Sequence, residues 1–486
     1  MSIRPAYGLI RPADRHPVGD REVVGLTVIV ALAVRTGPSA GTVVAVVIAL
    51  AVVGARRAGS VRAVTVAGLV VVGLAVVGSW RSADAWDDLA PDRLGAFEGW
   101  VRVVDDPQPY PSSTRVIVEI DGERFETWHR GRAARIRVDR WRAGEWVLVS
   151  GERVGLDADR RDRVSWQHVV GRFDVEWASD VVPGRPADRA SNRVRATIER
   201  GADVLPGDDG ALFRGLVVGD DRDQPPEMIA RFRVSGLSHL TAVSGQNVAF
   251  VLAAAGPFLV RLRPWWRWAV TLGLIGWFVS LTRFEPSIVR AGVMAGLSAT
   301  GFVLGRERTP IRILSWAVTG LLLVDPLLAW SIGFWLSVGA TAGVVAVGPW
   351  LSDRVSMLGL LAEPVAITLG AQVGVVMPLV WVFGSVPLVS VPANLLAVPV
   401  AGFVMLYGLP AGLLAGATAG PLPWVADVVM LPCRLGVRWV DTVAALGERL
   451  EPGGRASWIG WGVLVVAIVA IAARNRGRHG SASADR

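Results

Sequence analysis

The strongest constraint on this chain is a series of apolar runs, many of them close to the length of a membrane-spanning helix. About 20 apolar residues carry a helix across the hydrocarbon core, and only helices or closed barrels can satisfy their backbone groups there. Charged residues are 19% of the chain, against roughly 25% in soluble domains. We therefore predict a polytopic α-helical membrane protein, with spans at 23–34, 42–55, 63–80, 237–260, 268–282, 287–304, 313–330, 332–350, 364–384, 386–417 and 457–473.

Residues 84–192 break this pattern, because charges crowd together and the apolar runs shrink to strand length. The pair Asp121-Gly122 is a typical hairpin turn between two such runs. Five or six short strands suit a small barrel of the OB type. We predict a small β-barrel (OB-like) domain at 84–192, with strands at 96–104, 114–121, 124–130, 134–138, 145–154 and 164–177.

Arginine sets the predicted orientation, since the chain has no lysine and basic residues in short loops stay cytoplasmic. Arginine clusters precede the first span, follow the second and follow the fourth, and counting crossings places all three on one side. The β-barrel domain is then extracytoplasmic. The clusters are Arg4, Arg11, Arg15 and Arg21; Arg56, Arg57 and Arg62; and Arg261, Arg263 and Arg267.

The crossing count fails near the C-terminus. A single crossing by 386–417 would place the basic tail outside, against the arginine rule. Because prolines interrupt this run, we predict a split or re-entrant helix there. The charged stretch 421–446 is typical of an interfacial amphipathic helix, although it also has the length to cross. The predicted regions are N-terminal transmembrane anchor helices at 1–80, the barrel at 84–192, a transmembrane channel domain at 205–420, an interfacial helix and last span at 421–474, and a basic cytoplasmic tail at 475–486.

The barrel region interleaves aromatic residues with arginines. Single-stranded nucleic acid binds to surfaces that combine basic charge with aromatic stacking platforms. The alternative is that the aromatics fill the barrel core while the arginines face water. The candidate DNA-binding residues are Arg124, Trp128, Arg130, Arg132, Arg135 and Arg137.

Polar residues gather in the stretch "GLSHLTAVSGQNVAFV" (236–251), at the mouth of a predicted span. On a helix, Ser235, His239 and Gln246 share one face, with Asn247 beside it. Polar groups at membrane depth usually face a bundle interior or a water-filled path, although hydrogen bonds between helices are the alternative. Arg290 is the best buried candidate for contact with an anion, unless it forms an ion pair with Glu285 or Asp325.

Four ordered blocks carry a family resemblance. They are "FRGLVVGDDRDQPPEMIARFRVSGLSHLTAVSGQNVAFV" (213–251), "PSIVRAGVMAG" (286–296), "LLLVDPLLAWSIGFWLSVGATAGV" (321–344) and "AQVGVVMPLVWVFGSVPLVSVPANLLAVPVAGF" (371–403). Together they resemble the ComEC competence-protein family over most of 212–417. The resemblance implies an inner-membrane channel that imports single-stranded DNA during natural transformation.

Several positions match the family's motifs, whereas Asn247 stands where many members have a second histidine and Trp335 where they often have glutamine. With the polar stripe, the resemblance gives the expected channel lining: Ser235, His239, Ser244, Gly245, Gln246, Asn247, Arg290, Asp325, Gln372 and Asn394.

Many family members also have a metallo-β-lactamase-like domain, which we expect this chain to lack, since its five histidines are scattered. We expect no enzyme activity, metal or cofactor. The expected partners are single-stranded DNA, the lipid bilayer, a separate nuclease, a DNA-translocating ATPase and a second copy in a homodimer. Asp220, Asp221 and Asp223 are expected to cap or orient the helix leading into the membrane, or to hold a divalent ion. A transporter of a small solute or lipid fragment is the alternative function; Ser244 and His239 point apart on a helix, which disfavours an enzyme.

Overall fold

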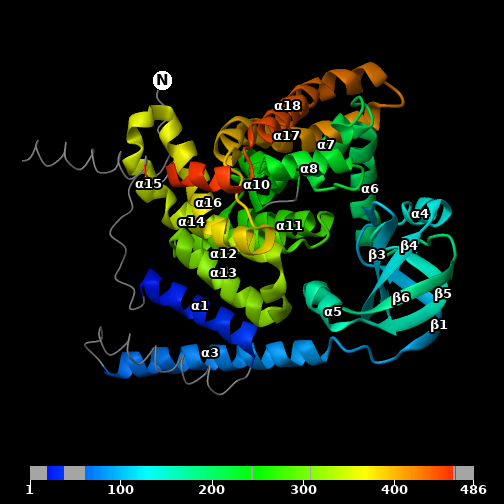
Figure 1. Cartoon of the computed structure of the whole chain (residues 1–486), viewed down its shortest axis with the longest axis horizontal. Helices are drawn as coiled ribbons and strands as arrows, with labels where there is room; N and C mark the ends of the chain where they lie inside the picture. The colour runs from blue at the N-terminus through cyan, green and yellow to red at the C-terminus, as the bar shows by residue number, and fades with distance from the viewer. Residues whose placement is uncertain (1–18, 38–60, 242–244, 307, 464–465, 467–486) are drawn as a thin grey trace, which may run out of the picture.

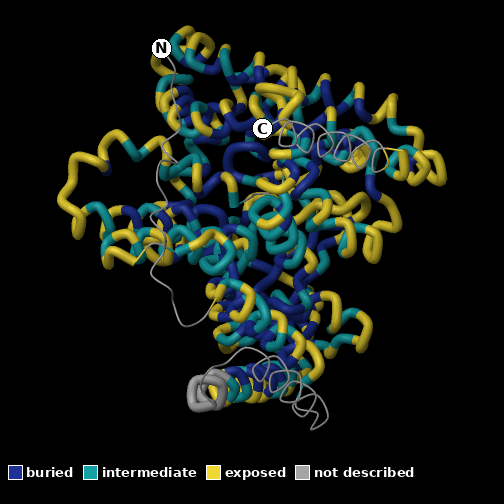
Figure 2. Tube along the Cα trace, turned by 90° about the vertical axis from the view of Figure 1, so that its left-hand side faces the viewer, coloured by how far each residue is buried: buried dark blue, intermediate teal, exposed yellow. Residues whose placement is uncertain are grey.

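The computed structural model describes residues 19–37, 61–241, 245–306, 308–463 and 466. The predicted span at 42–55 and the predicted tail at 475–486 lie outside these residues. Helices form most of the described chain, and a small β-barrel lies at one end of the molecule (Figure 1). The helices pack around several buried apolar clusters, whose backbone appears dark blue in Figure 2.

The barrel confirms the predicted β domain. Five strands close it in the order β1-β5-β6-β4-β3, because β1 also pairs with β3. β4 and β6 run parallel, whereas β1–β3, β1–β5, β5–β6 and β3–β4 are antiparallel. Closure leaves the barrel strands without open edges. The strands are β1 (Gly95–Val103), β3 (Ser113–Ile120), β4 (Glu123–Arg130), β5 (Trp146–Gly155) and β6 (Val169–Ala178), with β2 (Gln108–Tyr110) added beside β3.

The β3–β4 hairpin forms at the predicted turn. Asp121 and Gly122 have φ values of 53° and 94°, the left-handed pair that a two-residue hairpin requires. The predicted strand at 134–138 is wrong, because Arg132–Val138 forms the short helix α4. Five residues are too few to distinguish the hydrophobic period of a helix from that of a strand. In α4, Val138 is the only buried residue. β6 starts later than predicted, because α5 (Ala158–Val164) and the turn η1 (Ser165–Gln167) precede it.

The barrel packs against the helices through its own core. Phe125 and Phe173 fill the barrel interior, and Leu89 and Leu327 join the same buried cluster from the helical side. Leu89 follows helix α3 (Val61–Asp87), and Leu327 belongs to the turn η2 (Pro326–Trp330). The rings of Trp86 and Trp330 meet edge to face, with centroids 5.1 Å apart, beside this contact. The barrel therefore has a fixed position on the helical bundle.

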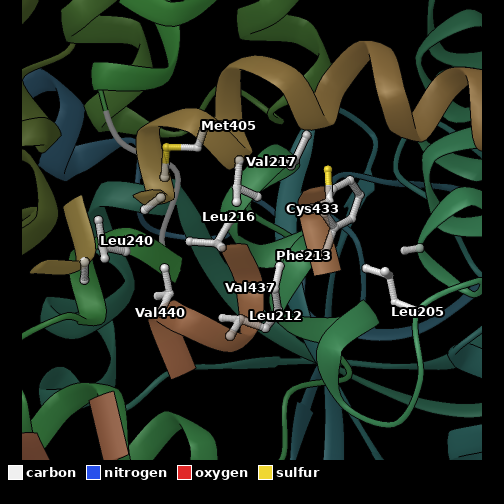
Figure 3. Close-up of a cluster of buried hydrophobic side chains, with 14 of the residues drawn as sticks. Leu205, Leu212, Phe213, Leu216, Val217, Leu240, Met405, Cys433, Val437 and Val440 are labelled. Carbon is white, nitrogen blue, oxygen red and sulfur yellow. The ribbon is translucent and has the colours of Figure 1, made fainter. Parts of the chain in front are cut away.

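The remaining helices make up the bundle. One buried cluster joins α7, α17 and α18 around Phe213, Met405 and Cys433 (Figure 3). The helices are α1 (Asp20–Thr36), α6 (Pro186–Ala202), α7 (Asp209–Val218), α8 (Pro226–Val234), α9 (Ser238–Thr241), α10 (Gly245–Leu259), α11 (Pro264–Leu281), α12 (Pro286–Val303), α13 (Pro310–Val324), α14 (Ile332–Ala346), α15 (Gly348–Arg354), η3 (Ser356–Leu361), α16 (Ala362–Phe383), α17 (Ser390–Thr418) and α18 (Pro423–Leu450).

Three helical segments of the described chain are long and apolar enough to cross a membrane: Gly68–Asp87, Ser356–Phe383 and Ser390–Thr418. The pair α14 and α15, bent by 44°, would make a fourth. The predicted split at 386–417 is wrong, because α17 runs unbroken through Pro399 and Pro410. Neighbouring helices allow proline inside a buried helix, since they and local adjustments satisfy the freed backbone groups.

The helix α18 covers the predicted interfacial stretch and packs along α17. Two of its charged residues pair with neighbouring helices: Arg438 lies 2.9 Å from Asp209 of α7, and Asp441 lies 2.6 Å from Arg231 of α8. Some of the charged residues that give α18 its amphipathic pattern therefore form ion pairs with other helices.

Candidate functional site

Polar groups converge on Ser390, the first residue of α17. The Gln372 amide of α16 donates to Ser390 Oγ at 2.9 Å, and Ser390 Oγ donates to the Pro387 carbonyl at 2.7 Å. Because the serine proton is used, Oε1 of Gln372 is left as an acceptor, and it is buried without a partner within the described residues. Oδ1 of Asn394, one turn along α17, is also buried without a hydrogen-bond partner in this part of the chain. An unmatched buried polar group costs about 1–3 kcal/mol, so these oxygens require a donor such as water.

The turn between α8 and α9 lies against this group. A Cβ on Gly236 would lie 2.5 Å from Cβ of Ser390, and Gly236 has a φ of 74°, so both space and backbone require glycine. His239 contacts the Gly236 backbone, and the residue is exposed. Ser235 is fully buried and donates to the Phe232 carbonyl at 3.2 Å. Gln372 and Asn394 thus lie near Ser390, and the turn that leads to His239 packs against it, while Ser235 faces the protein interior.

A second polar group surrounds Arg290 of α12. Its side chain is buried, with 4% exposure, and it donates to Ser337 Oγ of α14 at 3.1 and 2.7 Å. Its third contact is the Met294 sulfur at 2.9 Å. Among the residues that the structure describes, no carboxylate forms an ion pair with Arg290. The alternative of an ion pair with Glu285 or Asp325 is therefore not found in this part of the chain.

Glu285 and Asp325 have other surroundings. Burial, together with the nearby carboxylates Asp105 and Asp221, raises the pKa of Glu285 to about 7. Asp325 accepts from the Leu327 amide at 3.1 Å and lies 3.1 Å from Nε2 of His168 on the barrel. Asp325 thus caps η2 and joins the barrel to the bundle. Its predicted place among the lining residues stays a prediction. The sequence carries no local signal for this contact, because His168 lies 157 residues away.

Gly245, the first described residue of α10, lies beside Arg290. A Cβ on Gly245 would lie 3.1 Å from Nη2 of Arg290. Gln246 is exposed, whereas Asn247 is buried and donates to the Leu216 carbonyl of α7 at 3.4 Å. The predicted residue Ser244 lies outside the described residues. Ala291 Cβ would lie only 2.8 Å from the same added Cβ on Gly245, so the backbone of α10 packs directly against the start of α12. We call the Ser390 and Arg290 groups together the polar seam.

A buried ion network joins the barrel to the bundle, and sequence analysis alone did not identify it. Arg195 of α6 lies 3.1 Å from Asp106 of the barrel and 3.6 Å from Asp220. Arg283, which follows α11, donates to Asp106 at 3.0 and 3.2 Å. Burial opposes ionisation of Asp220, but its pairing with Arg222 at 2.6 Å holds its pKa below the usual range. A charged Arg195 on the otherwise apolar face of α6 was the one available signal.

This network also bears on the expected divalent-ion site. Asp220 is paired with arginines, and Asp223 lies 2.6 Å from Arg214. Within the described ranges, no group of three or more His, Cys, Asp or Glu residues is arranged to hold a metal ion. The other expectation, that these carboxylates cap or orient the helix leading into the membrane, stays a prediction.

The predicted DNA-binding residues of the barrel fall into two groups. Arg130, Arg132 and Arg137 are exposed. Arg124 donates to the Gln167 carbonyl at 3.1 Å, and Arg135 to the Pro111 carbonyl at 3.5 Å.

The aromatic residues of the barrel also divide. Phe125, Trp141 and Phe173 are buried in the core, as the alternative interpretation held. Trp128 lies in a row with Tyr110, whose ring centroid is 5.1 Å away, and Arg160, 5.4 Å from the ring. Tyr110 is 43% exposed. One end of this row is therefore open to solvent, beside the exposed arginines.

The fold and the polar seam define a helical protein with membrane-length apolar helices, a polar group buried between them and a barrel fixed at one end. The competence protein family matches residues 216–476, more than half of the chain, and the chain belongs to this family.

Three curated relatives are similar to parts of this chain. ComE operon protein 3 of Bacillus subtilis (strain 168) is 32% identical over 215 residues, covering 43% of this chain and 27% of the relative. Competence protein ComA of Neisseria gonorrhoeae is 30% identical over 200 residues, 39% of this chain and 28% of the relative. The uncharacterized protein YcaI of Escherichia coli (strain K12) is 28% identical over 267 residues, 51% and 34% respectively. The chain thus spans about a third or less of their length. No solved structure matches it.

Proposed function

We propose that this chain forms the channel through which single-stranded DNA crosses the bacterial cytoplasmic membrane during natural transformation. Membership of the competence protein family supports a role in DNA uptake. The observation that carries the channel role is Arg290, a buried guanidinium with only a hydroxyl and a thioether as partners in the described chain.

A polyanion crosses a bilayer only along a hydrated path that offers cations to its phosphates. Charged side chains at membrane depth are costly and usually serve such a path. The polar seam supplies a cation at Arg290, and unmatched acceptor oxygens at Gln372 and Asn394 that water molecules of a hydrated path would satisfy. A phosphate next to Arg290 would accept hydrogen bonds from its planar guanidinium.

The barrel is proposed to receive the strand before it enters the seam. Its strand order, its parallel β4–β6 pair and the helix α4 between β4 and β5 fit the OB type. The row of Tyr110 and Trp128 offers a base a surface for stacking, and Arg130, Arg132 and Arg137 offer charge to phosphates.

The proposal includes several partners. The protein is placed in the lipid bilayer as a multi-pass channel with no catalytic role, metal or cofactor of its own. A separate nuclease supplies the single strand, a DNA-translocating ATPase acts with the channel, and two copies of the chain form a homodimer. Transport of a small solute or lipid fragment through the same seam is the alternative, and deletion of the chain without loss of DNA uptake would favour it.

The test is Arg290→Lys beside Arg290→Gln, scored as uptake of labelled DNA. Lysine keeps the charge but loses the planar fork, so a phosphate contact weakens while simple charge balance survives. A hydrogen bond to a charged group contributes about 1.5–3 kcal/mol, so we expect uptake to fall roughly 10- to 100-fold in both variants. Arg312→Lys is the control, because Arg312 pairs with Asp20 at 2.9 Å. Wild-type uptake by both Arg290 variants at normal membrane abundance would contradict the channel assignment.

A further inference from the structure

The outward face of α6 carries arginines at helical spacing. α6 runs between the barrel and α17, as Figure 1 shows. Arg185 at its N-cap, Arg189, Arg193 and Arg200 are all exposed. The first three lie four residues apart on one face, about 6 Å per step along the axis. We call these four residues the α6 arginine stripe.

No acidic residue of α6 offsets the stripe. The carboxylate of Asp188 lies 3.7 Å from Arg102 of the barrel. The carboxylate of Glu199 lies 2.8 Å from Arg142 and 3.0 Å from Arg222. Both acids are thus engaged with other elements. Like charges four residues apart destabilise an isolated helix by about 0.2–0.5 kcal/mol per pair, so the stripe has a cost that an anionic partner would remove.

The stripe arginines make few contacts of their own. Arg189 donates to the Gly184 carbonyl at 2.9 Å, and Arg200 donates to the Gly416 carbonyl at 3.4 Å and to Thr197 at 3.0 Å. Within the described residues, none of the four stripe arginines forms an ion pair with a carboxylate. Their charge is therefore open to an external anion.

A groove accompanies the stripe where α6 meets the barrel. Its volume is about 270 Å³, and its lining includes Arg142, Arg189, Arg193 and Asn192. The one acid in the lining, Glu145, accepts from the Arg142 backbone amide at 2.8 Å. Arg142 is also paired with Glu199, so the open charge of the groove comes from Arg189 and Arg193 of the stripe.

We propose that the α6 arginine stripe and this groove bind the phosphodiester backbone of single-stranded DNA between the barrel and the polar seam. The inference rests on the proposed function and assigns the element that guides the strand. Steps of about 6 Å are comparable with the separation of successive phosphates on an extended strand. Arginine binds phosphate through two parallel hydrogen bonds, which suits a row of such contacts. On its inner face, Arg195 fixes α6 to Asp106, so the stripe is held rigidly beside the barrel.

The experiment compares salt dependence of DNA binding by the full-length protein in nanodiscs of neutral lipid. The variant is Arg189→Gln with Arg193→Gln, and the probe is a fluorescent oligothymidylate. Each phosphate contact to a single strand contributes about 0.7 to the slope of log K against log salt, so losing two flattens it by about 1.4. The charge-preserving pair Arg189→Lys with Arg193→Lys is expected to keep the wild-type slope. The matched control, Arg93→Gln with Arg233→Gln, removes two exposed arginines elsewhere.

An unchanged slope in the glutamine pair overturns the proposal. If that pair also retains less anionic lipid during purification, the stripe binds lipid headgroups instead. If the wild-type protein binds no oligonucleotide at low salt, the proposed function is contradicted as well. If the wild type binds and the glutamine pair has the same salt slope, only the assignment of α6 is contradicted. The proposal is also contradicted if the control pair flattens the salt slope as much as the glutamine pair does. In that case the loss of net charge alone would explain the flatter slope.

Discussion

The buried ring of His129 makes the stability of the barrel depend on pH. Its Nε2 lies 2.9 Å from Thr127 Oγ1, and its ring meets Trp141 edge to face at 5.6 Å. Burial, with Arg137 nearby, lowers the pKa of His129 from 6.5 to about 4. The unfolded chain therefore binds a proton between these values while the folded barrel does not. Stability is full above the unfolded pKa and falls as the pH drops from 6.5 toward 4.

This residue gives a prediction for the full-length protein. The pKa difference corresponds to a loss of about 3 kcal/mol across that pH window, because each unit is about 1.4 kcal/mol. We expect amide hydrogen exchange of β3–β4 peptides, corrected for intrinsic rates, to report this loss, and His129→Gln to remove most of it. Arg130→Gln, at an exposed position next to His129 on β4, is the control and should leave the slope in place. A slope that persists in His129→Gln would contradict the assignment.

At the scale of elements, glycines decide how closely α14 and α16 approach. A Cβ on Gly374 of α16 would lie 1.9 Å from the Gly339 carbonyl of α14, and one on Gly343 would lie 2.0 Å from the Gly370 carbonyl. Small residues permit such close crossings, where packing rather than water holds helices together. The crossing matters for function because α14 also supplies Ser337 and α16 supplies Gln372 to the polar seam.

The prediction at this scale is that Gly374→Ala destabilises the protein. Overpacking a tight contact costs about 1–3 kcal/mol. Gly320→Ala in α13 is the matched control, since its Cβ would meet nothing within 4 Å and alanine favours a helix. The measurement is the temperature at which half the detergent-solubilised protein leaves the monodisperse peak. Equal midpoints for Gly374→Ala and the wild type would show that the helices separate freely there.

At the scale of the whole molecule, several contacts fix the barrel on the bundle, among them one apolar contact and one ion network. The apolar contact of Leu89 and Leu327 lies on one side, and the ion pairs of Asp106 with Arg195 and Arg283 join it elsewhere. The barrel and the bundle are therefore expected to keep one relative orientation, so that the side of the membrane on which the barrel lies sets the direction of the polar seam.

The corresponding prediction concerns topology. In a Cys433→Ser background, Glu152→Cys on the barrel should react with a membrane-impermeant thiol reagent on whole cells. Arg263→Cys, between α10 and α11, should react only after permeabilisation. Both positions are exposed, so access depends on the membrane alone. The reverse labelling pattern would place the barrel in the cytoplasm.

The sequence by itself determined what depends on neighbours along the chain. The Asp121-Gly122 turn, the main barrel strands and the long apolar helices follow from turn chemistry and hydrophobic period. Arg290 was also identifiable, because a charge within an apolar run is conspicuous without any partner in view. Local signals fail where a run is too short for its period to be read, as at α4, or where a proline suggests a break that packing removes, as in α17.

Only the tertiary structure decided which polar groups meet. Asp325 lies 157 residues from His168, and Arg195 is separated from Asp106 by most of the barrel, so neither pairing has a local signature. Ser337 and Ser390 became part of the polar seam because helix crossings bring them to Arg290 and Gln372. Periodicity selects the face of a helix that is buried, whereas the partner across that face is set by packing between distant segments, and that packing made the polar seam.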